Sequence, residues 1–248
     1  MARSADGMAS DARDRQSPKS SWAWRAALRG VQYSAEQTAN LVRIAAVATF
    51  YAIHLVRYWG ERRGGSFGGV LPTVGGTAEL ERFHILATLL ALTWLAAALA
   101  LQLALQQKSY GLRMAAAATA ADVVLLTCLA NLAAGPRSPL VTGYFLIIAL
   151  AALRLSVPLV RGAALGAVAG YLCVLGAARW PEWWGRPADP SLLVPRYQQL
   201  LFASALAFAG IIAGQAVRCA QEFARRFAAL RGAEAADAAA VAEGDATR

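Results

Sequence analysis

The residues of this chain most able to do chemistry are ionisable side chains inside otherwise apolar stretches. Asp122 lies ten residues into one stretch, which is about 15 Å along a helix and therefore near its middle. His54 lies in an earlier stretch, and Tyr51 and Tyr58 stand three residues before it and four residues after it, on the same helical face. Arg154 lies near the end of a later stretch. Such groups inside a membrane can form a proton path or bind a polar ligand.

These groups need partners, because an unpaired charge at the centre of a bilayer costs at least about 2.5 kcal/mol. His54 or Arg154 could pair with Asp122 if their helices are neighbours. Three interpretations stay open: a polar clamp between helices, a ligand or proton site, and side chains that face lipid without a role. Arg43 and Arg57 are predicted to extend toward the two membrane surfaces.

The stretches that hold these residues are long enough to cross a membrane as helices. Of the 248 residues, 58% are hydrophobic and 16% are charged, whereas a soluble domain has about 25% charged residues. A bilayer core needs about 20 apolar residues in helical form. We predict an all-α integral membrane protein with short loops and about six transmembrane helices, at residues 41–58, 83–105, 112–134, 140–157, 159–178 and 197–217.

The distribution of Lys and Arg residues predicts the orientation of these helices, because positive residues are retained on the cytoplasmic side. Segments on the side of the N-terminus carry roughly twice as many of them as the other loops. Both termini are therefore predicted to be cytoplasmic, with tails 1–40 and 218–248 flanking the transmembrane domain 41–217. The net charge of +9 comes from arginines at helix ends, which favours membrane lipids and not nucleic acid as partners.

The N-terminal tail contains a candidate surface helix at residues 20–33. Trp22 and Trp24 with Arg25 and Arg29 suit an amphipathic helix that lies along the inner membrane surface. The alternative is a disordered basic tail.

The C-terminal tail contains a short apolar stripe. Ala220, Phe223, Phe227 and Leu230 recur at intervals of three, four and three residues, which is the spacing of a coiled-coil seam. The stripe predicts a contact with a second copy or with a cytoplasmic partner. The alternative is a helix leaving the membrane with its phenylalanines among the lipid headgroups.

Glycines at intervals of four residues predict faces where helices approach closely. Gly162, Gly166 and Gly170 share one face of the fifth predicted span, and Gly210 and Gly214 share one face of the sixth. We expect these two spans to pack on each other, and homodimerisation through the same face is the alternative.

The sequence offers no support for an enzyme. It contains no cluster with metal-ligand spacing, no nucleophile with a catalytic base in an aqueous setting, and no phosphate-binding Gly loop joined to a Lys. We therefore assign no catalytic residue, no cofactor and no metal.

One segment resembles a known family. Gly135-Pro136-Arg137-Ser138-Pro139-Leu140, then Tyr144-Phe145-Leu146, then Ala151-Ala152-Leu153-Arg154 is similar to a short loop and following span in the multi-helix membrane regions of bacterial sensor histidine kinases and related cyclases. The resemblance implies an input or anchoring module in the bacterial inner membrane. The chain lacks the family's phosphoacceptor His after the last span, its ATP-binding region and a cyclase motif.

The resemblance and the C-terminal stripe together predict a non-catalytic sensory or anchoring module that acts through another protein. The alternative is a small carrier or permease-like protein that uses the intramembrane Asp122 and His54.

Overall fold

The computed structural model describes residues 18–62, 77–106, 111–184 and 190–245, and this part of the chain contains helices and no strand. The α-helices are α2 (Pro18–Arg62), α3 (Thr77–Gln106), α4 (Leu112–Leu132), α5 (Gly143–Leu153), α6 (Val157–Arg179) and α7 (Arg196–Asp245). Short 3-10 turns lie at Gly135–Arg137, Pro139–Thr142, Pro181–Trp184 and Pro190–Leu192.

Five of these helices are long and apolar enough to cross a membrane: Tyr33–Gly60, Glu81–Gln106, Leu112–Leu132, Val157–Arg179 and Arg196–Gly232. Many of their large apolar side chains point away from the bundle, such as Leu165, Leu201 and Ile212, each more than two-thirds exposed. A soluble bundle would bury such residues, whereas lipid accepts them. The predicted α-helical membrane class is therefore supported.

The fourth predicted span, residues 140–157, is shorter than expected. Pro139 begins a 3-10 turn, and the α-helix α5 has only 11 residues. Together the turn and α5 rise about 25 Å, less than the bilayer core of about 30 Å. Proline lacks the amide that a helix needs, and at the other end Leu155, with φ +50°, leaves helical geometry. The sixth span thus remains a prediction.

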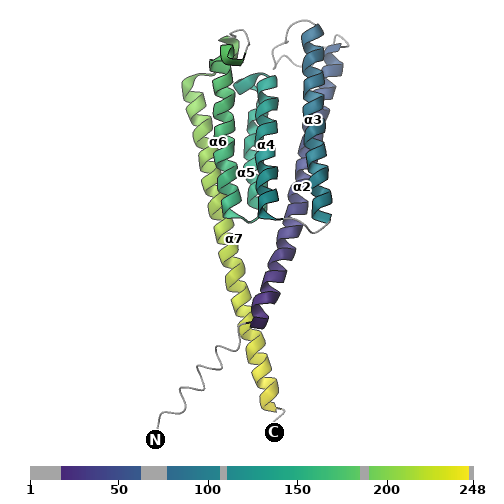
Figure 1. The fold of residues 1–248 in the computed structure, drawn as a ribbon. Coiled ribbons are helices and arrows are strands. Elements are labelled where there is room, and N and C mark those ends of the chain that lie inside the picture. The colour runs from purple at the N-terminus through teal and green to yellow at the C-terminus, as the bar shows by residue number, and fades with distance from the viewer. Residues whose placement is uncertain (1–17, 63–76, 107–110, 185–189, 246–248) are drawn as a thin grey trace.

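The helices form one bundle in which a hairpin of α2 and α3 stands beside α4, α5, α6 and α7 (Figure 1). The α2 helix packs on α5, and α3 packs on α4. The core between α4, α5 and α6 is apolar and includes Tyr144, Ile148 and Val160, all at most 2% exposed. The polar residues described below lie where α2 meets α4 and α5.

Two helices extend beyond the same end of the bundle (Figure 1). The α2 helix has 45 residues and α7 has 50, or about 68 and 75 Å of helix. Residues 18–40 are helical, so the first helix begins well before the predicted position 41. The segment 20–33 continues α2 without a break, and the side chains of 18–32 lie outside the described part, so the predicted amphipathic face stays a prediction.

Candidate functional site

One face of α2 carries three polar residues into the bundle. Glu36, Asn40 and Arg43 are spaced by four and three residues and are 4%, 0% and 3% exposed. Val47, four residues further on, continues the same buried face. Residues at this spacing lie on one side of a helix. Because lipid cannot satisfy polar groups, this face must pack against other helices.

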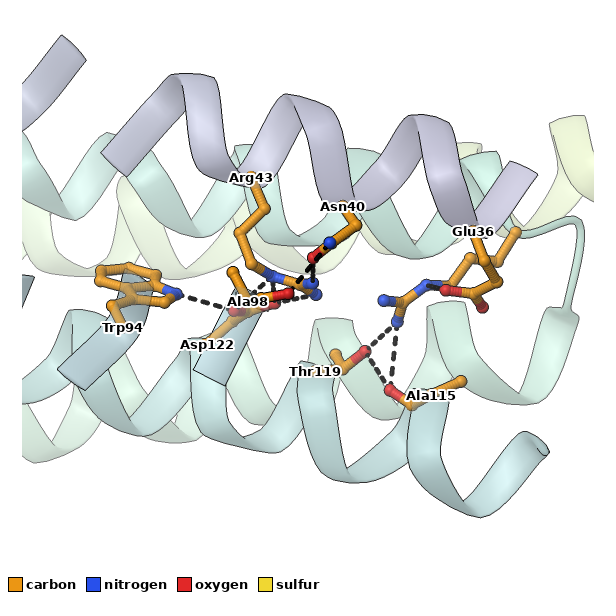
Figure 2. A network of polar contacts seen from close by, with 9 residues as sticks. Glu36, Asn40, Arg43, Trp94, Ala98, Ala115, Thr119 and Asp122 are labelled. Carbon is orange, nitrogen blue, oxygen red and sulfur yellow. Dashed lines mark hydrogen bonds and ion pairs between the residues drawn. The ribbon is translucent and has the colours of Figure 1, made fainter. Parts of the chain in front are cut away.

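Arg43 forms a two-pronged contact with Asp122 of α4 (Figure 2). Arg43 Nε donates to Asp122 Oδ1 at 2.8 Å, and Arg43 Nη2 donates to Oδ2 at 2.7 Å. Trp94 of α3 donates its indole Nε1 to Oδ1 at 2.9 Å. Bidentate pairing between guanidinium and carboxylate is among the strongest polar contacts in proteins. Asp122 is therefore held by three donors from two other helices.

Asn40 orients Arg43 and joins α2 to α3. Its Oδ1 accepts a hydrogen bond from Arg43 Nη1 at 2.9 Å, and its Nδ2 donates to the Ala98 carbonyl at 3.1 Å and to Gln102 Oε1 at 2.8 Å. Both the oxygen and the nitrogen of the Asn40 amide therefore form hydrogen bonds. Because Arg43 also binds Asp122 of α4, these contacts join the three helices α2, α3 and α4.

Arg154, at the end of α5, makes a second ionic contact. Its Nε lies 2.9 Å from Glu36 Oε2, and its Nη1 donates to Thr119 Oγ1 at 2.6 Å and to the Ala115 carbonyl at 3.1 Å. The contact with Glu36 is an ion pair without an aligned hydrogen bond. Arg154 Nη2 has no hydrogen-bond partner among the described residues. This pair is therefore less completely satisfied than the pair of Arg43 and Asp122.

The charges of this network balance, because two arginines face two carboxylates: Glu36, Arg43, Asp122 and Arg154, each at most 4% exposed. A buried charge without a partner is far more costly than a paired one. We define these four residues with Asn40 and Trp94 as the buried ionic network. It connects α2, α3, α4 and the end of α5.

The surroundings of Asp122 favour a polar clamp that holds helices together over a site that binds a ligand. The cavity beside Asp122 has a volume of about 20 Å³, and apart from Arg43 and Asp122 themselves it is lined by apolar and aromatic residues such as Val47, Leu126 and Ile147. A cavity of this size holds about one water molecule. This carboxylate already accepts hydrogen bonds from three donors of the protein itself, Arg43 Nε, Arg43 Nη2 and Trp94 Nε1. Of the three interpretations left open by the sequence, the polar clamp fits best.

The sequence-based pairing of Asp122 was wrong in its partners. Arg154 binds Glu36 and Thr119, and His54 lies against His84 of α3. Arg43, predicted to extend to a membrane surface, is instead the buried partner of Asp122. Asp122 and His54, the two residues named in the carrier hypothesis, therefore lie in separate clusters.

The face with Tyr51, His54 and Tyr58 packs on α3. Tyr51 OH lies 3.1 Å from Thr88 Oγ1, and His54 Nε2 lies 3.1 Å from His84 Nδ1. Tyr58 stacks on His84 with ring centroids 3.9 Å apart. The three residues predicted to share one helical face therefore all contact α3, where His84 meets both His54 and Tyr58.

Four network residues were missed or misjudged by sequence reasoning: Glu36, Asn40, Arg43 and Trp94. The first two were assigned to a cytoplasmic tail because the apolar run begins at Leu41. Their spacing with Arg43 and Val47 is the helical period and was the available signal. No spacing rule could identify Trp94, since its contact depends on how α3 packs.

The fifth and sixth predicted spans, α6 and α7, pack on each other as expected, but most of the glycines face elsewhere. A Cβ atom at Gly166 would touch Val123 of α4, and one at Gly170 would lie 2.7 Å from Thr127 Oγ1. Only Gly210 faces α6, where an added Cβ would overlap Ala164. Added Cβ atoms at Gly162 and Gly214 meet no atom within 4 Å. The fifth predicted span thus uses its glycines against the third.

The C-terminal stripe is exposed along α7. Phe223, Phe227 and Leu230 are 73%, 52% and 65% exposed, and Ala220 is exposed as well. Arg231 stacks over the Phe227 ring at 5.2 Å, and Arg226 pairs with Glu222 one turn earlier. No described residue of another helix covers the stripe.

The chain was compared with models of protein families, with curated proteins and with solved structures, and none of the three comparisons gave a match. The resemblance of Gly135–Arg154 to sensor membrane regions therefore rests on those residues alone.

Proposed function

We propose that this protein is a non-catalytic sensory or anchoring module of a bacterial inner membrane that acts through a partner bound to the extension of α7. In this proposal the chain crosses the membrane six times, with α5 and its 3-10 turn as the short fourth crossing, and both termini are cytoplasmic. The exposed stripe at Phe223, Phe227 and Leu230 is the observation that carries the proposal.

The position of the stripe relative to the membrane supports a protein contact. Arg196 and Arg218 are both exposed and lie 22 residues apart, or about 33 Å along the helix, which matches the thickness of a bilayer core. Phe223 is then about 8 Å past the inner boundary, whereas Phe227 and Leu230 are about 13 and 18 Å past it. A headgroup layer of about 5 to 8 Å can cover Phe223 alone. Phe227 and Leu230 lie beyond this layer, so only a partner protein would remove them from water.

A short chain of contacts links the buried ionic network to this extension. Gln221 Nε2 of α7 donates to the Leu155 carbonyl at 2.6 Å. Leu155 has a φ of +50°, which is uncommon for a residue other than glycine, and it directly follows Arg154 of the network. Because Arg154 pairs with Glu36, a displacement of α2 that moved Glu36 would act on Arg154 and on the adjacent Leu155, which Gln221 of α7 contacts.

Site-specific photocrosslinking in native membranes tests the proposal. A photoreactive phenylalanine analogue is placed at Phe223 or Phe227, and the matched control carries it at Arg225, which is exposed on the same turns but off the stripe. We expect a discrete protein adduct from the two stripe positions and none from Arg225. Adducts with lipid alone at Phe227, or equal yields at all three positions, would refute a partner on this stripe.

A further inference from the structure

The only two histidines of the chain meet each other. The sequence contains two histidines, 30 residues apart, on α2 and α3. His54 Nε2 lies 3.1 Å from His84 Nδ1, and the ring centroids are 5.3 Å apart with planes inclined by 23°. The two side chains are partly buried, near the C-terminal end of α2 and the N-terminal end of α3.

Neighbouring aromatic rings hold both imidazoles in place. Tyr58 stacks on His84 at 3.9 Å with an interplanar angle of 11°, and Phe83 meets His54 edge-on at 5.4 Å. One turn deeper, the contact of Tyr51 with Thr88 joins the same two helices. The nitrogens that face each other therefore belong to rings with little freedom to turn away.

The separation of these nitrogens suits two ligands of one metal ion. At metal–nitrogen bonds of about 2.05 Å, nitrogens 3.1 Å apart subtend about 98° at the ion. That angle lies between the octahedral and the tetrahedral values. A single hydrogen bond also fits the distance, but it requires one ring to carry a proton on the facing nitrogen and the other to lack it.

We propose that His54 Nε2 and His84 Nδ1 bind one divalent transition-metal ion, such as Zn²⁺, between α2 and α3. Imidazole nitrogens are preferred ligands of this class of ion. In the described part of the chain no group of three His, Cys, Asp or Glu residues could hold a metal, so the proposal assigns two protein ligands from the described residues.

A site with two protein ligands is expected to be weak and exchangeable. Structural zinc sites use four protein ligands, and catalytic zinc sites use three. The guanidinium of Arg62, which donates to Tyr58 OH at 3.3 Å, adds positive charge nearby and weakens binding further. His54 lies six residues before Gly60, the last residue of its span, or about 9 Å from the end of that span. A weak, exchangeable site suits the sensing of metal ions better than the permanent stabilisation of the α2–α3 pair.

Zinc titration of the purified full chain tests the proposal. The protein carries no histidine tag, and Cys128, Cys173 and Cys219, which are free and exposed, are replaced by Ser so that thiols cannot bind the ion. Calorimetry is expected to detect one Zn²⁺ per chain. His54→Gln and His84→Gln should each lower the affinity at least tenfold, because each removes one of the two ligands. Tyr51→Phe, which removes only the contact with Thr88, should change it less than about twofold.

A measurement on the chain with both histidines intact guards against variants that fail to fold. Cu²⁺ replaces Zn²⁺, and electron paramagnetic resonance counts the nitrogens bound to the copper. Two equivalent imidazole nitrogens support the site. Copper coupled to one nitrogen or none, zinc affinity unchanged in both Gln variants, or no zinc binding at millimolar concentration would overturn it.

Discussion

Two arginine–carboxylate pairs of this protein have nearly the same closest distance between nitrogen and oxygen but opposite surroundings. Arg43 and Asp122 lie 2.7 Å apart with side chains 4% and 5% exposed, and Arg226 and Glu222 lie 2.8 Å apart with side chains 76% and 62% exposed. Water can solvate each member of the exposed pair when its partner is absent. In the buried pair neither charge has that alternative. The distance between two charges thus says little about their importance until burial is known.

The largest expected effect comes from removing one charge of the buried pair. Asp122→Leu leaves the Arg43 guanidinium buried without its carboxylate, so we expect a loss of about 3 to 5 kcal/mol in the free energy of unfolding. Unfolding in mixed micelles with increasing denaturing detergent measures it. The double variant Arg43→Leu with Asp122→Leu removes both charges and should be less destabilised than Asp122→Leu alone. If the double variant loses the sum of the two single losses, the charges do not depend on each other.

The comparison of packed with open positions extends to uncharged residues. Gly170→Ala puts a Cβ atom 2.7 Å from Thr127 Oγ1 and 2.8 Å from Tyr144 OH, and we expect a loss of about 1 to 3 kcal/mol from overpacking. Gly162→Ala, two turns earlier on the same helix, meets no atom within 4 Å and should be neutral or stabilising by up to about 1 kcal/mol, since Ala favours helix over Gly. Similar values for both variants in the micelle assay would show that α4 and α6 do not approach as described.

The smallest effect is expected at the exposed pair. Glu222→Ala removes the partner of Arg226 in a setting where both side chains are mostly in water, so the unfolding free energy should fall by less than about 1 kcal/mol. Raising the salt concentration should shrink this difference, because exposed charges are screened. A loss as large as that of Asp122→Leu would mean that the extension is buried in the folded protein.

The sequence predicted the class of this fold better than the contacts within it. The long apolar runs identified the membrane helices, since the need to satisfy the backbone in lipid leaves few alternatives. The length of α5 was overestimated, because the apolar run begins at Leu140 whereas a 3-10 turn at Pro139–Thr142 delays the α-helix until Gly143. Hydrophobicity alone does not record where a helix begins.

The candidate site was only partly predictable. Asp122 was identified because a carboxylate is rare in an apolar run, but its partner was not, because an arginine near the end of a run can equally reach the membrane surface. Deciding between those outcomes for Arg43 requires knowing that α2 extends to Glu36 and packs on α3 and α5, which brings Arg43 to Asp122 of α4. The contact of His84 with His54 was likewise not predicted, because it depends on how α3 packs on α2.

We infer that the buried ionic network sets the relative position of the two helical extensions, those of α2 and α7. A distance between spin labels on these two helices tests this most directly. Labels at Ser34 of α2 and Arg225 of α7, both exposed, are measured by pulsed electron resonance with and without Arg154→Leu. The matched control is Arg161→Leu, which removes an exposed arginine of α6. We predict that Arg154→Leu shifts or broadens the distance distribution and that Arg161→Leu leaves it unchanged. An unchanged distribution in Arg154→Leu, in a bundle that remains folded, would contradict the claim.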